Sequence, residues 1–443
     1  MTLTRRPKRK SELEDEVFVK PTKTAVKNCV KLNISDVLAP IVFGIFLRLI
    51  AFAYFKEYLQ DHVGFTAQWN SFRRLKDAIA LWDQNGSLYA DRFHGVPLLA
   101  VIFYPLVPQE YILRVLFISC DVIAAVALYK SAGFVCNEAA EVPEVGKRLL
   151  TMYLLNPLTV GVCAAMNTTV ILNMALCVAF YFFVNKKLCM ATILVCLASQ
   201  LNIYYLQLLL PIVAARMIAQ TKDKFNLALA AKQLGYKLIA FSLLYSINFL
   251  IANWNDVIRG NVFFFFTLED YTPNMGMYWY LFSLIFVQYR LFFLVILHFL
   301  AFIHVFPLFK VFWTAPVGLW LIFLQMITLL SSYPTYAEFC LFLPLLTTIK
   351  AKQNSSVFFY FLVTLISLAC SSSLITLQQW VQTGSGNANF FFGSGIAYLI
   401  GQAFLLRHTL KSLVDSLFYN SDFYKADQAP QFRFINIPIL KKA

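Results

Sequence analysis

The feature that most constrains this sequence is a succession of long apolar runs separated by short polar segments, the first of which covers residues 37–55. A helix needs about 20 mostly apolar residues to cross a hydrocarbon core about 30 Å thick. Hydrophobic residues make up 59% of the 443 positions and charged residues only 14%, which is enough apolar length for around a dozen such helices. This composition excludes a disordered chain, a disulfide-rich module and an ordinary soluble enzyme.

We therefore predict an all-α polytopic membrane protein with about 12 transmembrane helices. The predicted spans are residues 37–55, 110–130, 149–163, 170–184, 188–201, 203–216, 238–252, 291–306, 313–330, 336–348, 357–380 and 390–406. Two further apolar segments are not expected to cross the membrane: the first should form a surface or re-entrant helix, and the second should lie along the far-side interface. Residues 95–108 are short and interrupted by three prolines, and residues 278–289 are rich in aromatic side chains and are followed by Arg290.

The net charge of +14 is concentrated between these runs and at the two ends of the chain. Lys and Arg gather in residues 5–31, 147–148, 186–187, 216–237, 350–352 and 407–442. Cytoplasmic loops of membrane proteins carry such a basic excess, so we expect both termini in the cytoplasm. The predicted divisions are a disordered basic leader (1–36), one transmembrane domain (37–406) with far-side loops near 57–108, 253–290, 331–335 and 381–389, and a tail (407–443). The charge then requires no nucleic-acid partner.

Three polar islands fall on the far side of this topology: residues 270–274, 332–335 and 383–389. Each contains Pro or Gly, and each could be an ordinary hairpin turn. Taken together they favour a binding site, because Asn, Ser, Thr and Tyr can bind hydroxyl or phosphate groups without burying an uncompensated charge. Sugars and phospholipid headgroups are ligands of this kind. The islands indicate no catalytic residue, no metal site and no cofactor.

Two charged residues lie in the middle of predicted membrane spans. Arg48 belongs to the first run and Asp121 to the second, and either charge alone is costly in hydrocarbon. At about 1.5 Å per helical residue, both come to lie near the middle of the bilayer. We predict a buried structural ion pair, although Arg48 could instead extend toward Lys56 at the interface.

The islands belong to a longer series of motifs in consistent order. They are Tyr153-Leu154-Leu155-Asn156-Pro157, Asp270-x-Thr272-Pro273-Asn274-x-Gly276-x-x-Trp279-Tyr280, Ser332-Tyr333-Pro334-Thr335 and Asn387-x-Asn389-Phe390-Phe391. From about residue 40 to about residue 410, the chain resembles the PIG-U family, polytopic subunits of the GPI transamidase in the endoplasmic reticulum membrane. It departs at Ala337-Glu338, where the family more often has Gly-Asp.

The resemblance implies a function that composition alone could not supply. GPI transamidase cleaves a C-terminal signal from a precursor protein and joins the new carboxyl end to the ethanolamine phosphate of a GPI glycolipid. The nucleophilic cysteine belongs to the caspase-like PIG-K subunit, and the PIG-U subunit is similar in architecture to GT-C glycosyltransferases. The resemblance assigns GPI binding to Asn387, Asn389, Ser332 and Tyr333, and we add Thr272, Asn274, Trp279 and Ser385 as further candidates from the same motifs. The resemblance also implies the partners of this chain: the GPI glycolipid, PIG-K, the other transamidase subunits and membrane lipids.

Two other functions compete with this hypothesis. A GT-C mannosyltransferase that uses a dolichol-linked donor has a similar outline, but such enzymes need a catalytic or metal-binding carboxylate, commonly in an Asp-x-Asp motif. The first far-side loop offers Asp61, Asp77, Asp83 and Asp91, and the chain contains no Asp-x-Asp. A transporter would favour whole-chain repeats with paired broken helices, and no such repeat is visible.

Overall fold

The computed structural model describes residues 34–89, 92–135, 141–221, 225–346 and 356–419, and every regular element within these ranges is helical. The α-helices are α1 Ile34–Tyr54, α2 Lys56–Asp61, α3 Phe72–Asn85, α4 Pro97–Phe103, α5 Glu110–Val135, α6 Val142–Leu154, α7 Pro157–Ala164, α8 Thr169–Val184, α9 Leu188–Leu201, α10 Leu209–Thr221, α11 Leu227–Tyr245, α12 Trp254–Val257, α13 Phe264–Thr267, α14 Tyr278–Leu284, α15 Val287–Ile303, α16 Val305–Phe312, α17 Pro316–Leu330, α18 Tyr336–Leu346, α19 Ser356–Leu377 and α20 Ala388–Tyr419. Short 3-10 segments cover Ile203–Leu208 and Ser246–Leu250, and π-helical segments cover Ile258–Phe263 and Gln378–Gln382.

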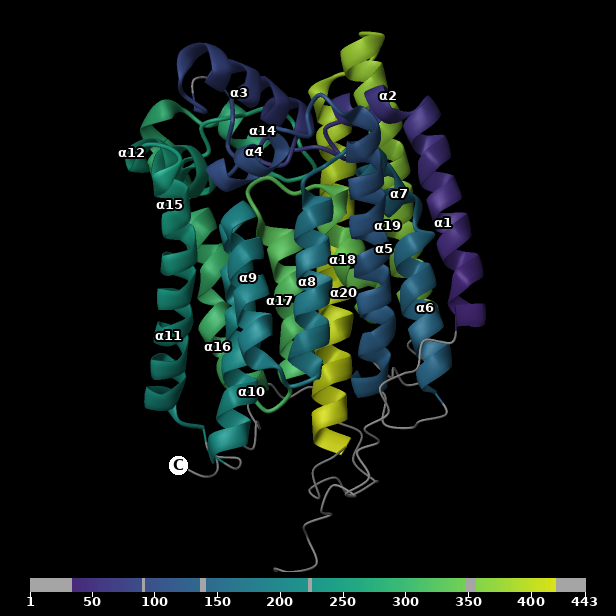
Figure 1. Cartoon of the computed structure of the whole chain (residues 1–443), viewed down its shortest axis with the longest axis vertical. Coiled ribbons are helices and arrows are strands. Elements are labelled where there is room, and N and C mark those ends of the chain that lie inside the picture. The colour runs from purple at the N-terminus through teal and green to yellow at the C-terminus, as the bar shows by residue number, and fades with distance from the viewer. Residues whose placement is uncertain (1–33, 90–91, 136–140, 222–224, 347–355, 420–443) are drawn as a thin grey trace, which may run out of the picture.

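The long helices run side by side as a bundle, and the short helices α2, α3, α4, α12 and α14 gather at one end of it (Figure 1). Within the described residues, 7 helical stretches are long and apolar enough to cross a membrane, and four shorter apolar helices accompany them. Each of the twelve predicted spans overlaps helical chain where the structure describes it. The prediction of an all-α polytopic membrane protein is therefore confirmed.

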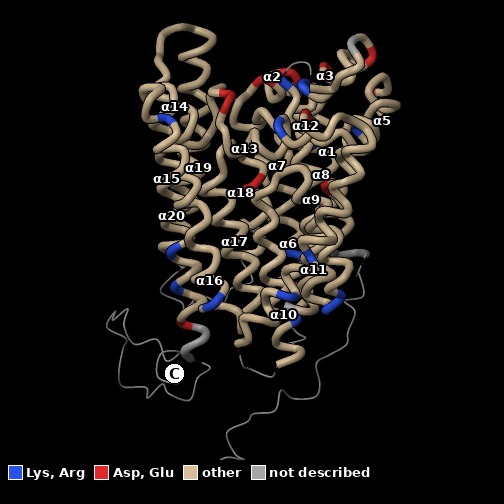
Figure 2. The backbone as a smooth tube through the Cα atoms, turned by 90° about the vertical axis from the view of Figure 1, so that its left-hand side faces the viewer, with Lys and Arg blue, Asp and Glu red and all other residues tan. Residues whose placement is uncertain are grey.

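The two ends of the bundle differ in charge (Figure 2). Lys and Arg dominate the end where α10 and α16 lie, which we call the basic end. The opposite end carries both signs around α2 and α3, and we call it the mixed-charge end. Helix α1 begins and α20 ends at the basic end (Figure 1), as the predicted topology requires.

Several predicted boundaries were wrong. The aromatic surface helix ends at Leu284, and Arg290 lies inside α15 instead of separating two segments. Arg290 can remain there because its Nη2 donates to the Leu268 carbonyl at 2.7 Å and its guanidinium lies 4.9 Å from the centre of the Tyr271 ring. The predicted basic loop 216–237 is largely taken up by α10 and α11, and α20 continues to Tyr419, beyond the predicted exit at residue 406. The predicted leader lies almost entirely outside the described residues.

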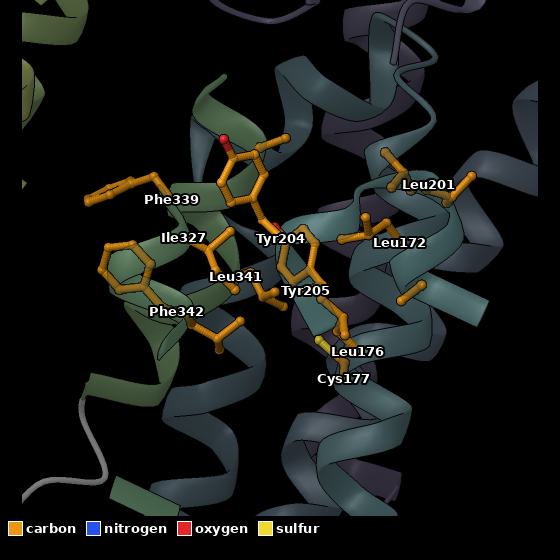
Figure 3. Close-up of a cluster of buried hydrophobic side chains, with 14 of the residues drawn as sticks. Leu172, Leu176, Cys177, Leu201, Tyr204, Tyr205, Ile327, Phe339, Leu341 and Phe342 are labelled. Atoms are coloured by element: carbon orange, nitrogen blue, oxygen red, sulfur yellow. The ribbon is translucent and has the colours of Figure 1, made fainter. Parts of the chain in front are cut away.

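The centre of the bundle is filled by side chains from α8, α9, the 203–208 segment, α17 and α18 (Figure 3). Tyr204 and Tyr205 lie among Leu172, Leu176, Ile327 and Phe342, and all six are buried. Lipid tails are as apolar as these residues, so close packing rather than escape from water holds such helices together.

The third predicted span is broken into α6 and α7 at Leu155-Asn156. Pro157 cannot donate a backbone hydrogen bond, and it occupies the first position of α7, where none is needed. The Asn156 side chain accepts a hydrogen bond from the Leu158 amide at 2.9 Å and so caps α7. The break leaves the last carbonyl groups of α6 without helical partners inside the bundle.

Arg48 and Asp121 meet beside this break. Arg48 Nε lies 2.8 Å from Asp121 Oδ2, and the two residues are 0% and 1% exposed. Arg48 Nη1 donates to the Leu154 carbonyl at 2.8 Å, and the Tyr153 hydroxyl donates to Asp121 Oδ1 at 3.1 Å. The Thr159 hydroxyl donates to the Tyr153 carbonyl at 2.6 Å. The ion pair thus joins α1 to α5 and also satisfies backbone groups that the break exposes.

We expect Arg48→Met and Asp121→Leu each to destabilise the chain by about 3–5 kcal/mol, because each leaves an uncompensated buried charge. The double variant should cost clearly less than the sum of the two. Unfolding in detergent of the wild type, both single variants and the double variant measures this coupling. Strict additivity would contradict a coupled pair.

Candidate ligand-binding site at the mixed-charge end

The segment 268–280 connects the three polar islands. Its first part is held by Asp270, whose Oδ1 accepts a hydrogen bond from the Thr272 amide at 2.8 Å and whose Oδ2 pairs with Arg74 at 2.9 Å. Thr272 is partly exposed, and its carbonyl accepts a hydrogen bond from Gln68 Nε2 at 2.7 Å. Asn274 is buried and accepts from the Gly276 amide at 2.8 Å. These bonds fix the first island against α3 and the loop before it.

The second island is enclosed by protein. Ser332 is 0% exposed, donates to the Phe265 carbonyl at 2.8 Å and lies 2.8 Å from the Tyr204 hydroxyl. Tyr333 is 1% exposed and stacks on Phe264 with ring centres 4.4 Å apart. The structure therefore places these two predicted site residues beneath the surface.

The departure from the family pattern at Ala337-Glu338 has a structural explanation. Glu338 Oε2 accepts hydrogen bonds from the Thr335 amide at 2.8 Å and from its hydroxyl at 2.6 Å. The pair Thr335 and Glu338 has the spacing of a capping box at the start of α18. Glu338 thus stabilises the turn that carries Ser332 and Tyr333.

The third island is exposed at the start of α20. Asn387 Oδ1 accepts a hydrogen bond from the Asn389 amide at 3.0 Å, and both side chains are exposed. Ser385 is also exposed, and its hydroxyl lies 2.7 Å from that of Thr383. Gly384 between them has φ of +65°, a conformation that glycine adopts without strain. The island presents a row of amide and hydroxyl groups to its surroundings.

The segment 268–280 contacts both other islands. A methyl group on Gly276 would lie 2.8 Å from Pro334 Cδ, so only glycine lets the first and second islands pack this closely. The Tyr280 hydroxyl donates to Asn389 Oδ1, which joins α14 to the third island. The three islands therefore form one connected region at the mixed-charge end.

Stacked aromatic rings lie next to Asn389 and form what we call the aromatic platform: Trp279, Tyr280, Trp380, Phe391 and Phe392. Trp279 stacks on Trp380 with ring centres 6.1 Å apart and an interplanar angle of 19°, and Tyr280 stacks on Phe392 at 4.1 Å and 19°. Sequence reasoning named only Trp279 among these five as a site residue. The pairing depends on how α14 meets α20, which spacing along the chain does not reveal.

Several buried donors in this region have no hydrogen-bond partner among the described residues, among them Trp279 Nε1, Asn274 Nδ2 and the Tyr333 hydroxyl. A buried donor without a partner costs about 1–3 kcal/mol. A ligand or water that offers acceptor oxygens here would recover that energy. The site is therefore equipped for a ligand rich in oxygen atoms.

Comparison with known proteins gives the family. The model of the family described as GPI transamidase subunit PIG-U matches residues 42–398, which is more than half of the chain. This chain belongs to the PIG-U family. The human GPI-anchor transamidase component PIGU is 24% identical over 388 residues, covering 79% of this chain and 87% of the human protein. The GPI transamidase component GAB1 of Saccharomyces cerevisiae is 23% identical over 374 residues, covering 79% and 87%.

Membership of this family supports a GPI transamidase subunit and not a mannosyltransferase. The Schizosaccharomyces pombe GAB1 homologue, named a GPI transamidase component, is 22% identical over 379 residues and covers 82% of this chain. The matched range includes all three polar islands, the Arg48–Asp121 pair and the aromatic platform.

The loops of the mixed-charge end contain one buried histidine, His62, and one half-buried histidine, His94. Burial lowers the pKa of His62 to about 4, and its Nδ1 accepts a hydrogen bond from the Gly64 amide at 3.0 Å. Burial also lowers the pKa of His94 to about 4, and its ring stacks on Phe264 at 3.6 Å. An unfolded histidine has a pKa near 6.5. Between pH 6.5 and 4 the unfolded chain therefore binds protons that the folded chain excludes, and stability falls as the pH falls.

We expect His94→Phe, which keeps a ring against Phe264 but cannot bind a proton, to lose less stability than the wild type between pH 6.5 and 4. Melting temperatures of the purified chain in detergent at a series of pH values test this. Above pH 7 both proteins should show no pH dependence from this group. Equal losses in the two proteins on acidification would rule out His94 as a source of acid sensitivity.

Proposed function

We propose that this chain is the non-catalytic subunit of GPI transamidase that binds the GPI glycolipid and presents it for attachment to proteins in the endoplasmic reticulum membrane. The observation that carries the proposal is the exposed Asn387 and Asn389 amides beside the aromatic platform, with the unpaired Trp279 donor next to them. The mixed-charge end would face the lumen and both termini the cytoplasm, because basic residues gather at the other end.

The chemistry of this region suits a glycolipid headgroup. Asn side chains both donate and accept hydrogen bonds, as sugar hydroxyl groups do. Trp and Tyr rings combine an apolar face with a polar edge and favour the membrane interface, where a lipid-linked glycan begins. Exposed apolar side chains beside the platform, among them Phe286, Val287, Val381 and Phe390, offer contacts for acyl chains.

The other predicted site residues differ in how directly they would contact the glycolipid. Ser385, Asn387 and Asn389 would contact the glycan directly, since they are exposed. Asn274 and Trp279 would bind through side-chain donors that have no partner among the described residues, and Thr272 through its hydroxyl oxygen, whose proton is donated to Asp270. Ser332 and Tyr333 would support the site from beneath, because both are enclosed by protein.

The chemistry of transamidation would be supplied by a partner. Six of the seven cysteines that the structure describes are buried, and the exposed one, Cys189, lies in the first turn of α9 after two lysines. None of these seven thiols is exposed among the three islands. We assign the nucleophile to a caspase-like PIG-K subunit, with this chain as its lipid-presenting partner among the other transamidase subunits.

We expect the combined change Asn387→Ala and Asn389→Ala to lower GPI attachment about tenfold or more, because at least two hydrogen bonds to the glycan are lost, each worth about 0.5–1.5 kcal/mol. Complex assembly should be unchanged, since neither side chain is buried. Surface display of a GPI-anchored reporter in cells that lack the native subunit measures attachment, and affinity purification of the tagged chain measures assembly.

A matched control is available in the same chain. Asn253 Oδ1 accepts from the Asn255 amide at 3.0 Å in the same local geometry as Asn387 and Asn389, and both are exposed. Changing Asn253 and Asn255 to Ala should leave attachment intact. Normal display by the Asn387 and Asn389 double variant would overturn the proposed site.

A further inference from the structure

A second feature of the mixed-charge end is a polar cavity of about 410 Å³ between α3, the loop before it and the first island. Its wall includes Thr272 and Pro273 of the segment 268–280. Pockets that hold small molecules measure roughly 300–1,000 Å³. The cavity is therefore large enough for a ligand, and it shares only Thr272 with the glycolipid site described above.

Three guanidinium groups line the cavity. Arg73 pairs with Asp61, and Arg74 pairs with Asp270 at 2.9 Å. Arg92 is exposed, and no hydrogen bond or ion pair of its side chain is found among the described residues. Guanidinium groups bind phosphate in a two-pronged geometry, which makes Arg the side chain best suited to this anion.

The same wall carries acceptors that a phosphate cannot satisfy. Gln68 is only 3% exposed; its Nε2 bonds the Thr272 carbonyl, while its Oε1 is buried without a partner in the described part of the chain. Asp77 lines the cavity one turn along α3 from Arg73, and its carboxylate has no ion-pair partner among the described residues. Gln68 Oε1 requires a hydrogen-bond donor, and Asp77, which is exposed, offers a negative charge that suits a cationic donor.

We propose that this cavity binds a phosphate ester that also carries an ammonium group, of which phosphoethanolamine is the simplest example. The phosphate faces the guanidinium groups, with Arg92 supplying a cation that has no ion-pair partner in the described ranges. The ammonium group faces Asp77 and Gln68 Oε1. A plain anion would leave Gln68 Oε1 without a donor and would be repelled by Asp77, and a neutral sugar would make no use of the Arg92 charge.

The inference rests on the proposed function in one respect, because the GPI glycolipid is a source of this group at the same end of the bundle. Thr272 on the cavity wall and Tyr280 beside Asn389 are eight residues apart on one segment. At no more than about 3.3–3.6 Å per residue, this segment keeps the cavity within about 26–29 Å of the platform. The headgroup of phosphatidylethanolamine is the other source of the same chemistry.

Titration of the full-length chain in phosphatidylcholine nanodiscs tests the proposal. Isothermal titration calorimetry compares the affinity for phosphoethanolamine with the affinities for its two parts, inorganic phosphate and ethanolamine. We expect phosphoethanolamine to bind at least about tenfold more tightly than either half, because a charge-assisted hydrogen bond is lost in each. Arg92→Gln and Asp77→Asn should each weaken phosphoethanolamine binding by about tenfold, and only Arg92→Gln should weaken phosphate binding.

Matched controls are Arg259→Gln and Asp256→Asn, which remove exposed charges near α12 that do not line the cavity. Both controls should bind phosphoethanolamine like the wild type, and melting temperatures of all four variants should be unchanged. Equal binding of phosphate and phosphoethanolamine, or equal losses in Arg92→Gln and Arg259→Gln, would overturn the proposal. So would the lack of phosphoethanolamine binding by the unaltered chain.

Two further experiments distinguish the two sources of the phosphoethanolamine group and test the cavity separately from the glycolipid site. In nanodiscs that contain phosphatidylethanolamine, loss of the phosphoethanolamine signal would identify the bilayer lipid as the occupant, and an unchanged signal would identify the glycan. The Asn387→Ala and Asn389→Ala chain should titrate like the wild type. A failed titration overturns the cavity assignment alone, whereas normal GPI attachment by that double variant overturns the glycolipid site alone.

Discussion

The arrangement of the mixed-charge end depends on the need to satisfy backbone groups where a membrane helix is broken. In hydrocarbon there is no water to pair with the carbonyl groups at the end of α6. Arg48 pairs with one of them, Thr159 with another, and Asp121 compensates the charge that this introduces. The break redirects the chain into α7 and sets the position of everything that α7 contacts.

What α7 contacts is the loop that supports the site. A methyl group on Gly161 would meet the Phe65 ring at 2.4 Å, and Asn167, just beyond α7, donates to the Phe65 carbonyl. From the same loop Gln68 bonds the Thr272 carbonyl, and the Trp69 indole donates to the Tyr333 carbonyl at 3.1 Å. A chain of contacts thus runs from the buried ion pair to two of the polar islands.

The sequence was sufficient for the membrane class, the helical character of the apolar runs and the shared location of the islands, because apolar length and charge placement act locally. It could not show that Ser332 and Tyr333 are enclosed while Asn387 and Asn389 are exposed, since burial depends on which helices meet. From the sequence, no role was assigned to Arg73 and Arg74. Their convergence on Gln68 depends on contacts between residues far apart in the chain, and no local spacing records it. The prediction that Arg290 separates two segments was wrong for a related reason. Its partners Leu268 and Tyr271 lie some twenty residues earlier in the chain.

The segment 268–280 touches Arg74 at one end, Pro334 in its middle and Asn389 at the other. Glycine at 276 leaves it little room to move independently of its neighbours. A ligand that shifts this segment at Thr272 would also shift Tyr280, and the reverse holds by the reciprocity of thermodynamic linkage. Occupancy of one part of the mixed-charge end would then set the affinity of the other, which would give the proposed lipid-presenting role a means to distinguish a complete headgroup from a fragment.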